Sequence, residues 1–206
     1  MNGKLLVSSS FLLLTIAISG CSCLFNTKPI SLPTDLPSRY KIDNVPYYPQ
    51  EEYQCGPATL AMALSYIEKP EPISKLTSMV YSPEREGSLQ PFMVAGVRRL
   101  GVLSYEISGF EELLTEIANN QPVIVLQNNG LSWLPRWHYA VVTGYDSKAE
   151  TIFLHSGSNQ DYQIDWCRFE NTWQRSKYWG MVVVSPPKLP ASAKPDRLFL
   201  ALSQLE

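Results

Sequence analysis

The sequence predicts an α+β protein, with helices mostly in the first half of the chain and an antiparallel sheet mostly in the second. Apolar residues recur at helical spacing in several segments up to residue 118. Short apolar runs bounded by turn residues then follow one another from residue 122 to residue 184. Because the two kinds of segment are separated along the chain, we expect an antiparallel sheet and no alternating βαβ units.

Helices are predicted in the first half of the chain. The first runs from Pro57 to the residue before Pro70, because a residue that precedes proline is pushed out of helical space. Leu60, Leu64 and Ile67 would form its single apolar face. The next elements are helices over 73–79 and 89–100, a strand over 102–107 and a helix over 110–118.

The second half is predicted to hold most of the strands. They cover residues 122–127, 138–145, 151–155 and 179–184. One helix interrupts them, with Asp165 as its cap and with Trp166, Phe169 and Trp173 on one stripe. No internal repeat is visible.

The composition is that of a compact domain. The chain has 206 residues, of which 45% are hydrophobic and 17% charged, which is too apolar for a disordered chain. Its net charge is −2 and no basic tract appears, so we expect no nucleic-acid partner. The four cysteines and two histidines show no zinc-site spacing, so we expect no metal and no other cofactor. Cys167 is expected to be a packed side chain.

Residues 1–20 have the pattern of a secretory signal: one charge at Lys4, then an apolar run and small residues. The sequence Ile18-Ser19-Gly20-Cys21 resembles a bacterial lipobox, which implies lipidation of Cys21 and a membrane anchor. An ordinary signal peptide that ends near a cysteine is the alternative. Ser22, where an aspartate would favour retention at the inner membrane, points by the same resemblance to the outer membrane and the periplasm.

The rest of the chain divides into three parts. Residues 21–40, with Pro29, Pro33 and Pro37, are predicted to form an extended tether, or else a plain disordered linker. Residues 41–187 form the predicted domain. Residues 188–206 form a tail with one short amphipathic helix, for which the chain offers no partner of its own, so a protein partner is a candidate.

Cys55 is the candidate nucleophile. It precedes Gly56-Pro57, and proline is favoured in the first turn of a helix. The thiol would therefore lie at a helix N-terminus, where free N–H groups and the helix dipole lower a cysteine pKa. Gly56 and Ala58 would leave room for a substrate. The alternative is a buried structural cysteine.

A nucleophilic cysteine needs a base within reach, and the candidate is His138. It begins an otherwise apolar strand, which would place it at the rim of the core. A hydrogen-bonded edge histidine is the alternative. Trp133 and Trp137 could wall a peptide groove, although for each one alone a covering role over the core is favoured.

The segments QCGPATLAMAL and HYAVVTGYD resemble the papain-like bacteriocin-processing (double-glycine leader) cysteine peptidase family. With the lipobox, the PQ-x-x-YQCGPA start, the WHYAVV strand and the HSG turn, the chain is most similar to its bacterial lipoprotein branch. The similarity covers about residues 41–193. It implies a papain-like fold and a membrane-anchored peptidase that hydrolyses peptides or proteins in the periplasm, with Cys55 as nucleophile and His138 as base and then acid.

The resemblance also implies two supporting residues. A glutamine before the cysteine supplies an oxyanion donor, here Gln50, with Gln54 as the alternative. The family aspartate that orients the histidine is replaced by the sequence His155-Ser156-Gly157, and Ser156 is the aligned position. Ser158, Asn159 and His155 stay open as alternatives. Asp146 is excluded, because eight strand residues at ~3.3 Å each place it ~26 Å from His138.

Two other functions compete with this hypothesis. The missing aspartate would suit a degenerate domain that binds peptides or partners without cleaving them. An NlpC-type cell-wall endopeptidase also uses a cysteine at a helix start and a histidine on a strand, often with a second histidine, which His155 could supply.

Overall fold

The structure is a computed structural model, and it describes residues 33–49 and 54–205. The predicted signal peptide, the lipidation of Cys21, most of the tether and Gln50 lie outside the described residues. Within the described ranges, no helix combines the length and the hydropathy that a membrane-spanning helix needs.

A seven-stranded sheet forms one half of the domain, and all its strand pairs are antiparallel. Its order is β4-β9-β5-β6-β7-β8, and β1 also pairs with β6. The strands are β1 (Arg39–Lys41), β4 (Leu103–Ser108), β5 (Val123–Asn128), β6 (Trp137–Asp146), β7 (Thr151–Ser156), β8 (Asn159–Asp165) and β9 (Trp179–Val184). A separate short hairpin joins β2 (Tyr81–Ser82) to β3 (Gly87–Ser88) around a 3-10 turn (Pro83–Arg85).

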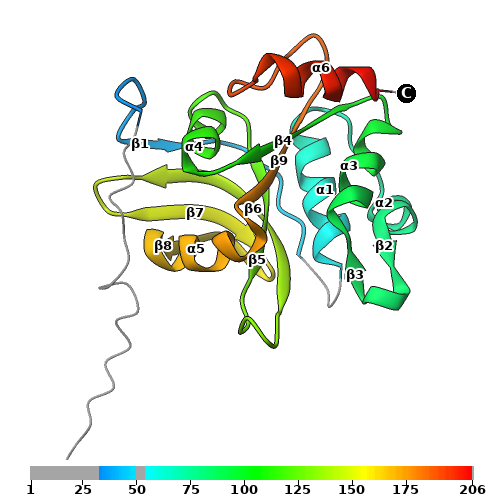
Figure 1. Ribbon diagram of the computed structural model, residues 1–206, viewed down its shortest axis with the longest axis horizontal. Coiled ribbons are helices and arrows are strands. Elements are labelled where there is room, and N and C mark those ends of the chain that lie inside the picture. Colours follow the sequence, from blue (N-terminus) through cyan, green and yellow to red (C-terminus); the bar gives the residue numbers. More distant parts are fainter. Residues whose placement is uncertain (1–32, 50–53, 206) are drawn as a thin grey trace, which may run out of the picture.

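Three helices gather on the other side of the domain, and Figure 1 shows them beside the sheet. They are α1 (Cys55–Tyr66), α2 (Ile73–Val80) and α3 (Gln90–Arg98). The remaining helices are α4 (Phe110–Ala118), α5 (Trp166–Trp173), which continues into a 3-10 turn (Gln174–Ser176), and α6 (Pro195–Ser203). Helices first and an antiparallel sheet second is the order that the sequence predicts, so the α+β class is confirmed.

Helix α1 passes through the centre of the molecule. Every residue from Gly56 to Leu64 is buried, so the prediction of a single apolar face is wrong. Three alanines at positions 58, 61 and 63 keep the helix thin, which lets α2 and the sheet approach it from different sides. A helix that packs against its neighbours on all sides can neither slide along its axis nor rotate about it. The residue in its first turn therefore has a fixed position.

Strand β6 is shared by three neighbours. Its first half pairs with β5, and its second half pairs with β7 on one side and β1 on the other. The register shifts between Val142 and Gly144. Gly144 is required there, because a Cβ atom at this position would lie 2.7 Å from the carbonyl oxygen of Tyr40 in β1. His138 and Asp146 lie near opposite ends of this strand, as expected.

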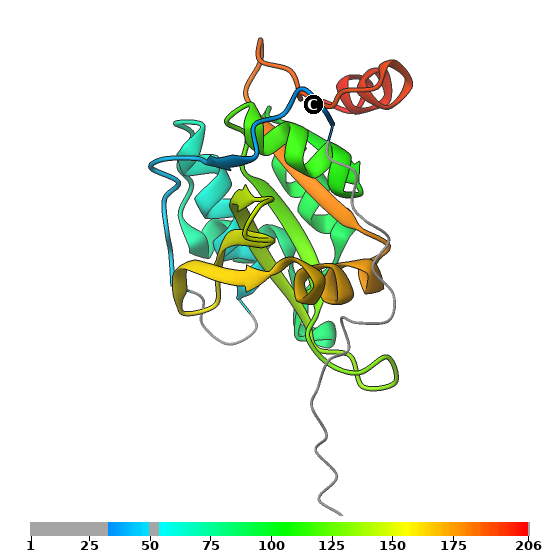
Figure 2. The ribbon, with the colours of Figure 1, turned by 90° about the vertical axis from the view of Figure 1, so that its left-hand side faces the viewer.

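Several elements have the predicted bounds, namely α4, α5 and β9. Asp165 caps α5, since its carboxylate accepts a hydrogen bond from the Arg168 N–H at 3.2 Å. Strand β8 is absent from the sequence prediction, because this exposed edge strand carries polar residues without alternation; Figure 2 looks on to this edge. Strand β1 takes in Arg39 and Tyr40, which the sequence places in the tether.

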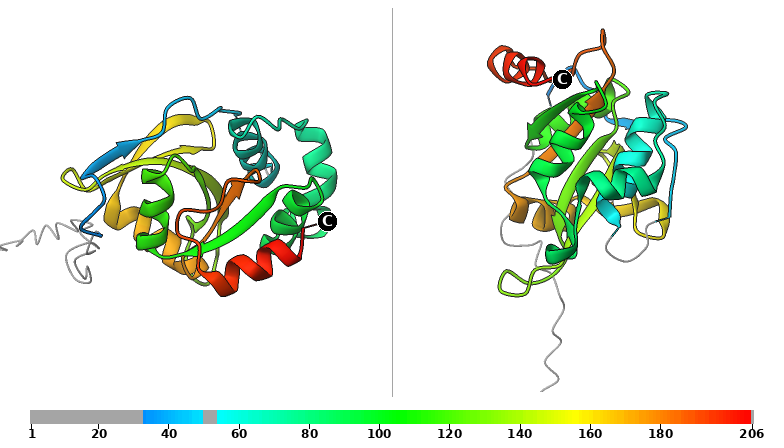
Figure 3. Two further views of the ribbon diagram at one scale, coloured as in Figure 1. Left: turned by 90° about the horizontal axis from the view of Figure 1, so that it is seen from above. Right: turned by 90° about the vertical axis from the view of Figure 1, so that its right-hand side faces the viewer.

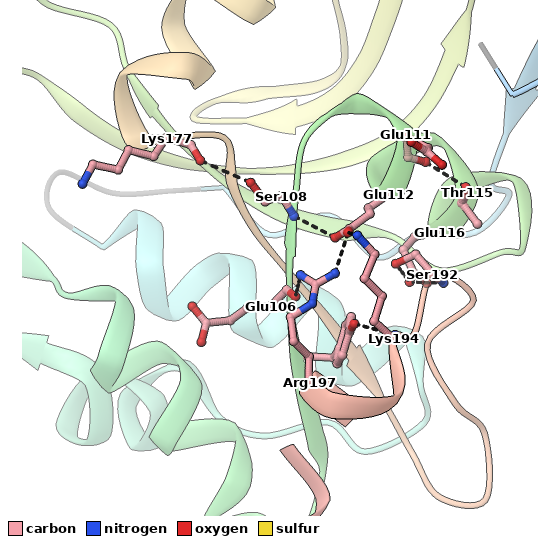
Figure 4. Close-up of polar contacts among 11 residues, drawn as sticks. Glu106, Ser108, Glu111, Glu112, Thr115, Glu116, Lys177, Ser192, Lys194 and Arg197 are labelled. Carbon is pink, nitrogen blue, oxygen red and sulfur yellow. Dashed lines mark hydrogen bonds and ion pairs between the residues drawn. The ribbon is translucent and has the colours of Figure 1, made fainter. Parts of the chain in front are cut away.

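The C-terminal tail packs on the domain, so the prediction that it has no partner in this chain is wrong. Seen from above in Figure 3, α6 lies along β4. The Glu112 carboxylate forms ion pairs with Lys194 at 2.7 Å and with Arg197. It also accepts a hydrogen bond from the Ser108 N–H at 3.0 Å, and Figure 4 shows this cluster. The outer face of α6 stays exposed, with Phe199 76% accessible.

A second carboxylate holds the segment that leads into α6. Glu116 is fully buried and accepts hydrogen bonds from the backbone of Ala191 and from the backbone and hydroxyl of Ser192. Burial raises the pKa of Glu116 despite these bonds. Burial also acts to raise the pKa of Glu112, but hydrogen bonds from Arg197, Lys194 and Ser108 outweigh it and lower that pKa.

We predict that Glu112→Gln lowers the free energy of unfolding by about 1–2 kcal/mol, because two cations lose a nearly buried partner. The melting temperature at pH 7 would fall by about 2–8 °C, which differential scanning calorimetry would detect. Glu111→Gln, one residue away and exposed, is the matched control and should change little. A carboxylate with a lowered pKa stabilises the fold above its unfolded pKa of about 4.3 and loses this effect on acidification. The difference between the two variants should therefore shrink as the pH falls below about 4.3 and vanish only below the lower pKa that Glu112 has in the folded protein, and a difference that grows with acid would contradict the assignment.

Candidate active site

Cys55 is the first residue of α1, and it faces a large cleft between the two halves of the domain. The cleft has a volume of about 1490 Å³. On the helical side it is lined by Cys55 and residues 85–90. On the sheet side it is lined by residues 106–108, 126, 135–139, 157, 175–177, 179 and 197. Cys55 and His138 thus share one cleft, one from α1 and the other from β6.

The thiol of Cys55 is a neutral group in this environment. Burial raises its pKa, and hydrogen bonding to the backbone of Tyr139, Gly56 and Cys55 itself acts in the opposite direction without overcoming it. The predicted lowering of the Cys55 pKa is therefore wrong in direction. Backbone hydrogen bonds at the helix start lower this pKa, but burial of the thiol raises it by more. The contact with the backbone of Tyr139 places the sulfur next to the residue that follows His138.

His138 is half-buried, and Ser156 binds one of its ring nitrogens. The distance from His138 Nε2 to Ser156 Oγ is 2.9 Å. Burial lowers the pKa of His138, so the ring is neutral near pH 7. Nδ1 is the nitrogen left to face a thiol. Among the described residues no hydrogen bond joins the ring to Cys55 in this structure.

The register of β6 and β7 explains how Ser156 reaches the histidine. Val141 lies opposite His155 and Val142 opposite Leu154, which places residue 158 opposite residue 138. Ser156 is two positions away along the strand, within reach of a long side chain on the same face. Of the open candidates for this role, the aligned residue Ser156 is the one whose side chain hydrogen-bonds the His138 ring.

His155 has a structural position on the opposite face of β7. It is buried, and its Nδ1 accepts a hydrogen bond from the Asp161 N–H at 3.1 Å. Its Nε2 must then carry the proton, which it donates to the carbonyl oxygen of Val45 at 3.1 Å. The ring of Tyr47 packs edge-on against it. Both nitrogens are occupied, so His155 holds the 45–47 segment to the sheet.

The loop before β6 forms an exposed wall of the cleft. Trp133 is 77% exposed and Trp137 50%, so the interpretation of these rings as a cover for the core is wrong. The loop is nevertheless ordered by Asn128, whose buried amide oxygen accepts hydrogen bonds from the N–H groups of Gly130 and Arg136, both at 2.9 Å. Trp137 and Pro135 line the cleft.

Gly56 makes room for the protein's own chain and not for a substrate, in contrast to the prediction. It is buried, and a Cβ atom there would lie 2.4 Å from the Ser88 hydroxyl and 2.6 Å from Ser88 Cβ. The β2–β3 hairpin can therefore seal the helical side of the cleft against the start of α1. The Ser88 hydroxyl itself is buried and lacks a hydrogen-bond partner among the described residues.

Other predicted residues have these places. Gln50 is outside the described residues, whereas Gln54 is the half-buried residue before α1 and its side chain makes no capping bond. Asp146 pairs with Arg39 at the far end of β6, at 3.5 Å. Cys167 is disulfide-bonded and is not the simple packed residue that the sequence suggests. In the described part of the chain, no group of three His, Cys, Asp or Glu side chains could hold a metal ion.

The sequence matches one family of proteins over residues 42–181, the span that holds the cleft, Cys55, His138 and Ser156. The chain belongs to the Peptidase_C39 like family. No curated protein matches the sequence significantly.

Solved structures show the same fold at low sequence identity. A protein described as a C39-like peptidase from Bacillus anthracis superimposes with a TM-score of 0.61 and 18% identity, over 73% of this chain and 99% of the other. The peptidase domain of Streptococcus ComA, a bifunctional ABC transporter of a quorum-sensing pathway, gives 0.54 and 21%, over 70% and 98%. A double glycine motif protease of an AMS/PCAT transporter, solved with its leader peptide, gives 0.51 and 19%, over 70% and 97%. The papain-like fold of C39 peptidases is thereby confirmed.

We predict that Gly56→Ala destabilises the fold by about 1–3 kcal/mol, because the new methyl group collides with Ser88 in a packed region. Urea denaturation would measure the change. Gly87→Ala is the matched control in the same hairpin, because its Cβ would lie 3.7 Å from the nearest atom. Ser88→Gly in the Gly56→Ala background should restore part of the loss, whereas equal effects of Gly56→Ala and Gly87→Ala would contradict this role of Gly56.

Proposed function

We propose that this protein is a cysteine peptidase that hydrolyses peptide bonds, with Cys55 as the nucleophile and His138 as the base and then the acid. One observation carries the proposal: Cys55 and His138 line the same cleft, and Ser156 hydrogen-bonds Nε2 of His138, which leaves Nδ1 for the thiol. Membership of a peptidase family supports it. The neighbour solved with a leader peptide supports a peptide or protein as the substrate.

The neutral pair sets the order of proton transfers. His138 Nδ1 accepts the proton of the thiol as the Cys55 sulfur attacks the carbonyl carbon of the substrate. The protonated ring then gives this proton to the leaving amine, and water hydrolyses the thioester. Throughout, Ser156 Oγ can accept the hydrogen bond of Nε2–H and so keep the ring in one tautomer. The oxyanion would be stabilised by Gln50, or by Gln54, together with the Cys55 N–H.

The cell envelope is the proposed location. The lipobox at Cys21 supports a lipid anchor, and Ser22 supports the outer membrane facing the periplasm. The disulfide bond of Cys167 is consistent with an oxidising compartment. In such a compartment Cys55 has to stay reduced, which its burial favours.

A peptide-binding protein without peptidase activity is the second candidate. Two observations favour it: burial raises the pKa of the thiol, and a neutral hydroxyl stands where a carboxylate would stabilise a charged imidazole. The NlpC-type alternative loses its supporting observation, because both nitrogens of His155 are bound within the fold.

The test is cleavage of a mixed peptide library, followed by mass spectrometry of the new termini. The wild-type chain should produce them, whereas Cys55→Ala should produce none. Ser156→Ala should slow cleavage about tenfold, because the ring loses the hydrogen bond that orients it. Ser158→Ala is the matched control and should cleave at the wild-type rate. Peptide binding without any cleavage would leave the second candidate.

We predict an alkaline profile for alkylation of Cys55 by iodoacetamide. Burial raises the pKa of the thiol and lowers that of His138, so the thiolate forms only above the ordinary cysteine range of about 8.5. Ser156→Asp places a negative charge beside His138, which raises the pKa of the ring. The imidazolium would then favour the thiolate, and alkylation would extend to lower pH. An acidic plateau in the wild-type profile would contradict the neutral pair.

A further inference from the structure

The walls of the cleft are more basic than the rest of the protein. Among the described residues, the lining includes five cations, Arg85, Arg136, Arg175, Lys177 and Arg197, and two acids, Glu86 and Glu106. The whole chain has a net charge of −2, so positive charge is concentrated at the site. A cleft that gathers one sign of charge raises the local concentration of ligands of the opposite sign.

The charges are not neutralised evenly along the cleft. Arg197 is paired with Glu112, and the Glu106 carboxylate accepts a hydrogen bond from the Trp179 indole at 2.6 Å. By contrast, the described residues give no carboxylate partner within ion-pair distance to Arg136, Arg175 or Lys177. These three residues, which we call the basic rim, lie on the sheet side of the cleft.

The three side chains of the basic rim are exposed, but the fold holds the Arg175 guanidinium and the backbone of the other two residues. Arg175 donates hydrogen bonds to the carbonyl oxygens of Asn128 and Gly130, which fixes its guanidinium on the loop before β6. The backbone of Arg136 is held on the buried side-chain oxygen of the same Asn128. One buried residue therefore organises two of the three cations.

The backbone of Lys177 is held by Ser108, at the end of β4. Its backbone is left-handed, with φ 59°, and its carbonyl oxygen accepts a hydrogen bond from the Ser108 hydroxyl at 3.4 Å. Ser108 is in turn held by Glu112, the residue that anchors α6. Figure 4 shows the Lys177 side chain extending away from that carboxylate, so its charge is left for the cleft.

We propose that the basic rim is a subsite for an acidic side chain, and that this protein selects peptides that carry Asp or Glu close to the bond at Cys55. The proposal rests on the peptidase function proposed above, because a peptide bound at Cys55 and His138 lies in the cleft that the rim borders. An acidic side chain would give these three cations the carboxylate partner that the described residues do not provide. Trp137, half-exposed beside Arg136, offers an apolar contact for the same segment.

Binding to the full chain carrying Cys55→Ala tests the subsite without chemistry. The probes are two fluorescent peptide libraries of equal length, identical except that one contains Glu where the other contains Gln. We expect the Glu library to bind about fivefold or more tightly at 50 mM NaCl, and the preference to disappear at 500 mM, because exposed charges are screened by salt. Arg136→Gln/Lys177→Gln should abolish most of the preference, and Lys148→Gln, an exposed lysine at the β6–β7 turn, should retain it.

Each outcome has a definite meaning. Equal binding of the two libraries, binding of neither, or a preference that survives in the double variant would overturn the acidic subsite. Cleavage of the mixed library by the wild-type chain without any preference for Glu would overturn this inference and leave the peptidase intact. A preference for Glu together with no cleavage by the wild-type chain would overturn the peptidase and leave an acidic-peptide binding site.

Discussion

The contact between the start of α1 and the start of β6 is the constraint on which the site depends. Cys55 belongs to the helical half and His138 to the sheet, and no local sequence signal can join them. Packing brings the two elements together, because α1 is enclosed on all sides and Cys55, its first residue, hydrogen-bonds the backbone of Tyr139. A shift of either element by one residue would break this contact between Cys55 and the backbone of Tyr139.

The same burial sets the chemistry of the pair. It raises the pKa of the thiol and lowers that of the imidazole, and both shifts favour the neutral forms. A carboxylate on the far ring nitrogen would oppose this by stabilising the imidazolium, but Ser156 provides only a hydroxyl. Ser156 thus holds the ring of His138 in place without charging it.

The fold class and the central residues could be predicted from the sequence because they depend on local patterns. The apolar runs of β6 and β9, the cap at Asp165 and the glycine and proline after Cys55 are all local features. Ser156 could be named because it is the position aligned with the family aspartate, whereas the choice among Ser156, Ser158, Asn159 and His155 needed the structure, in which Ser156 hydrogen-bonds the His138 ring.

The remaining features depend on contacts between distant segments. Strand β8 has a polar sequence and forms only because β7 offers it an edge. The direction of the Cys55 pKa shift depends on the burial of the thiol in the folded chain. The need for a glycine at position 56 becomes clear only once Ser88 is placed against it. The sequence also assigns the exposed rings of Trp133 and Trp137 to the core, because an aromatic residue next to a strand has the same pattern in either position.

The tail after residue 187 illustrates how a segment outside the matched span can still shape the site. Glu112 binds Lys194 and Arg197 from the tail and the backbone of Ser108 from β4, and the Ser108 hydroxyl holds the carbonyl of Lys177. The family match ends at residue 181, before the tail begins. Glu112 and direct hydrogen bonds from Lys194 to Tyr105 and from Arg197 to Glu106 connect the tail to β4, so the position of α6 and the position of one wall of the cleft are coupled.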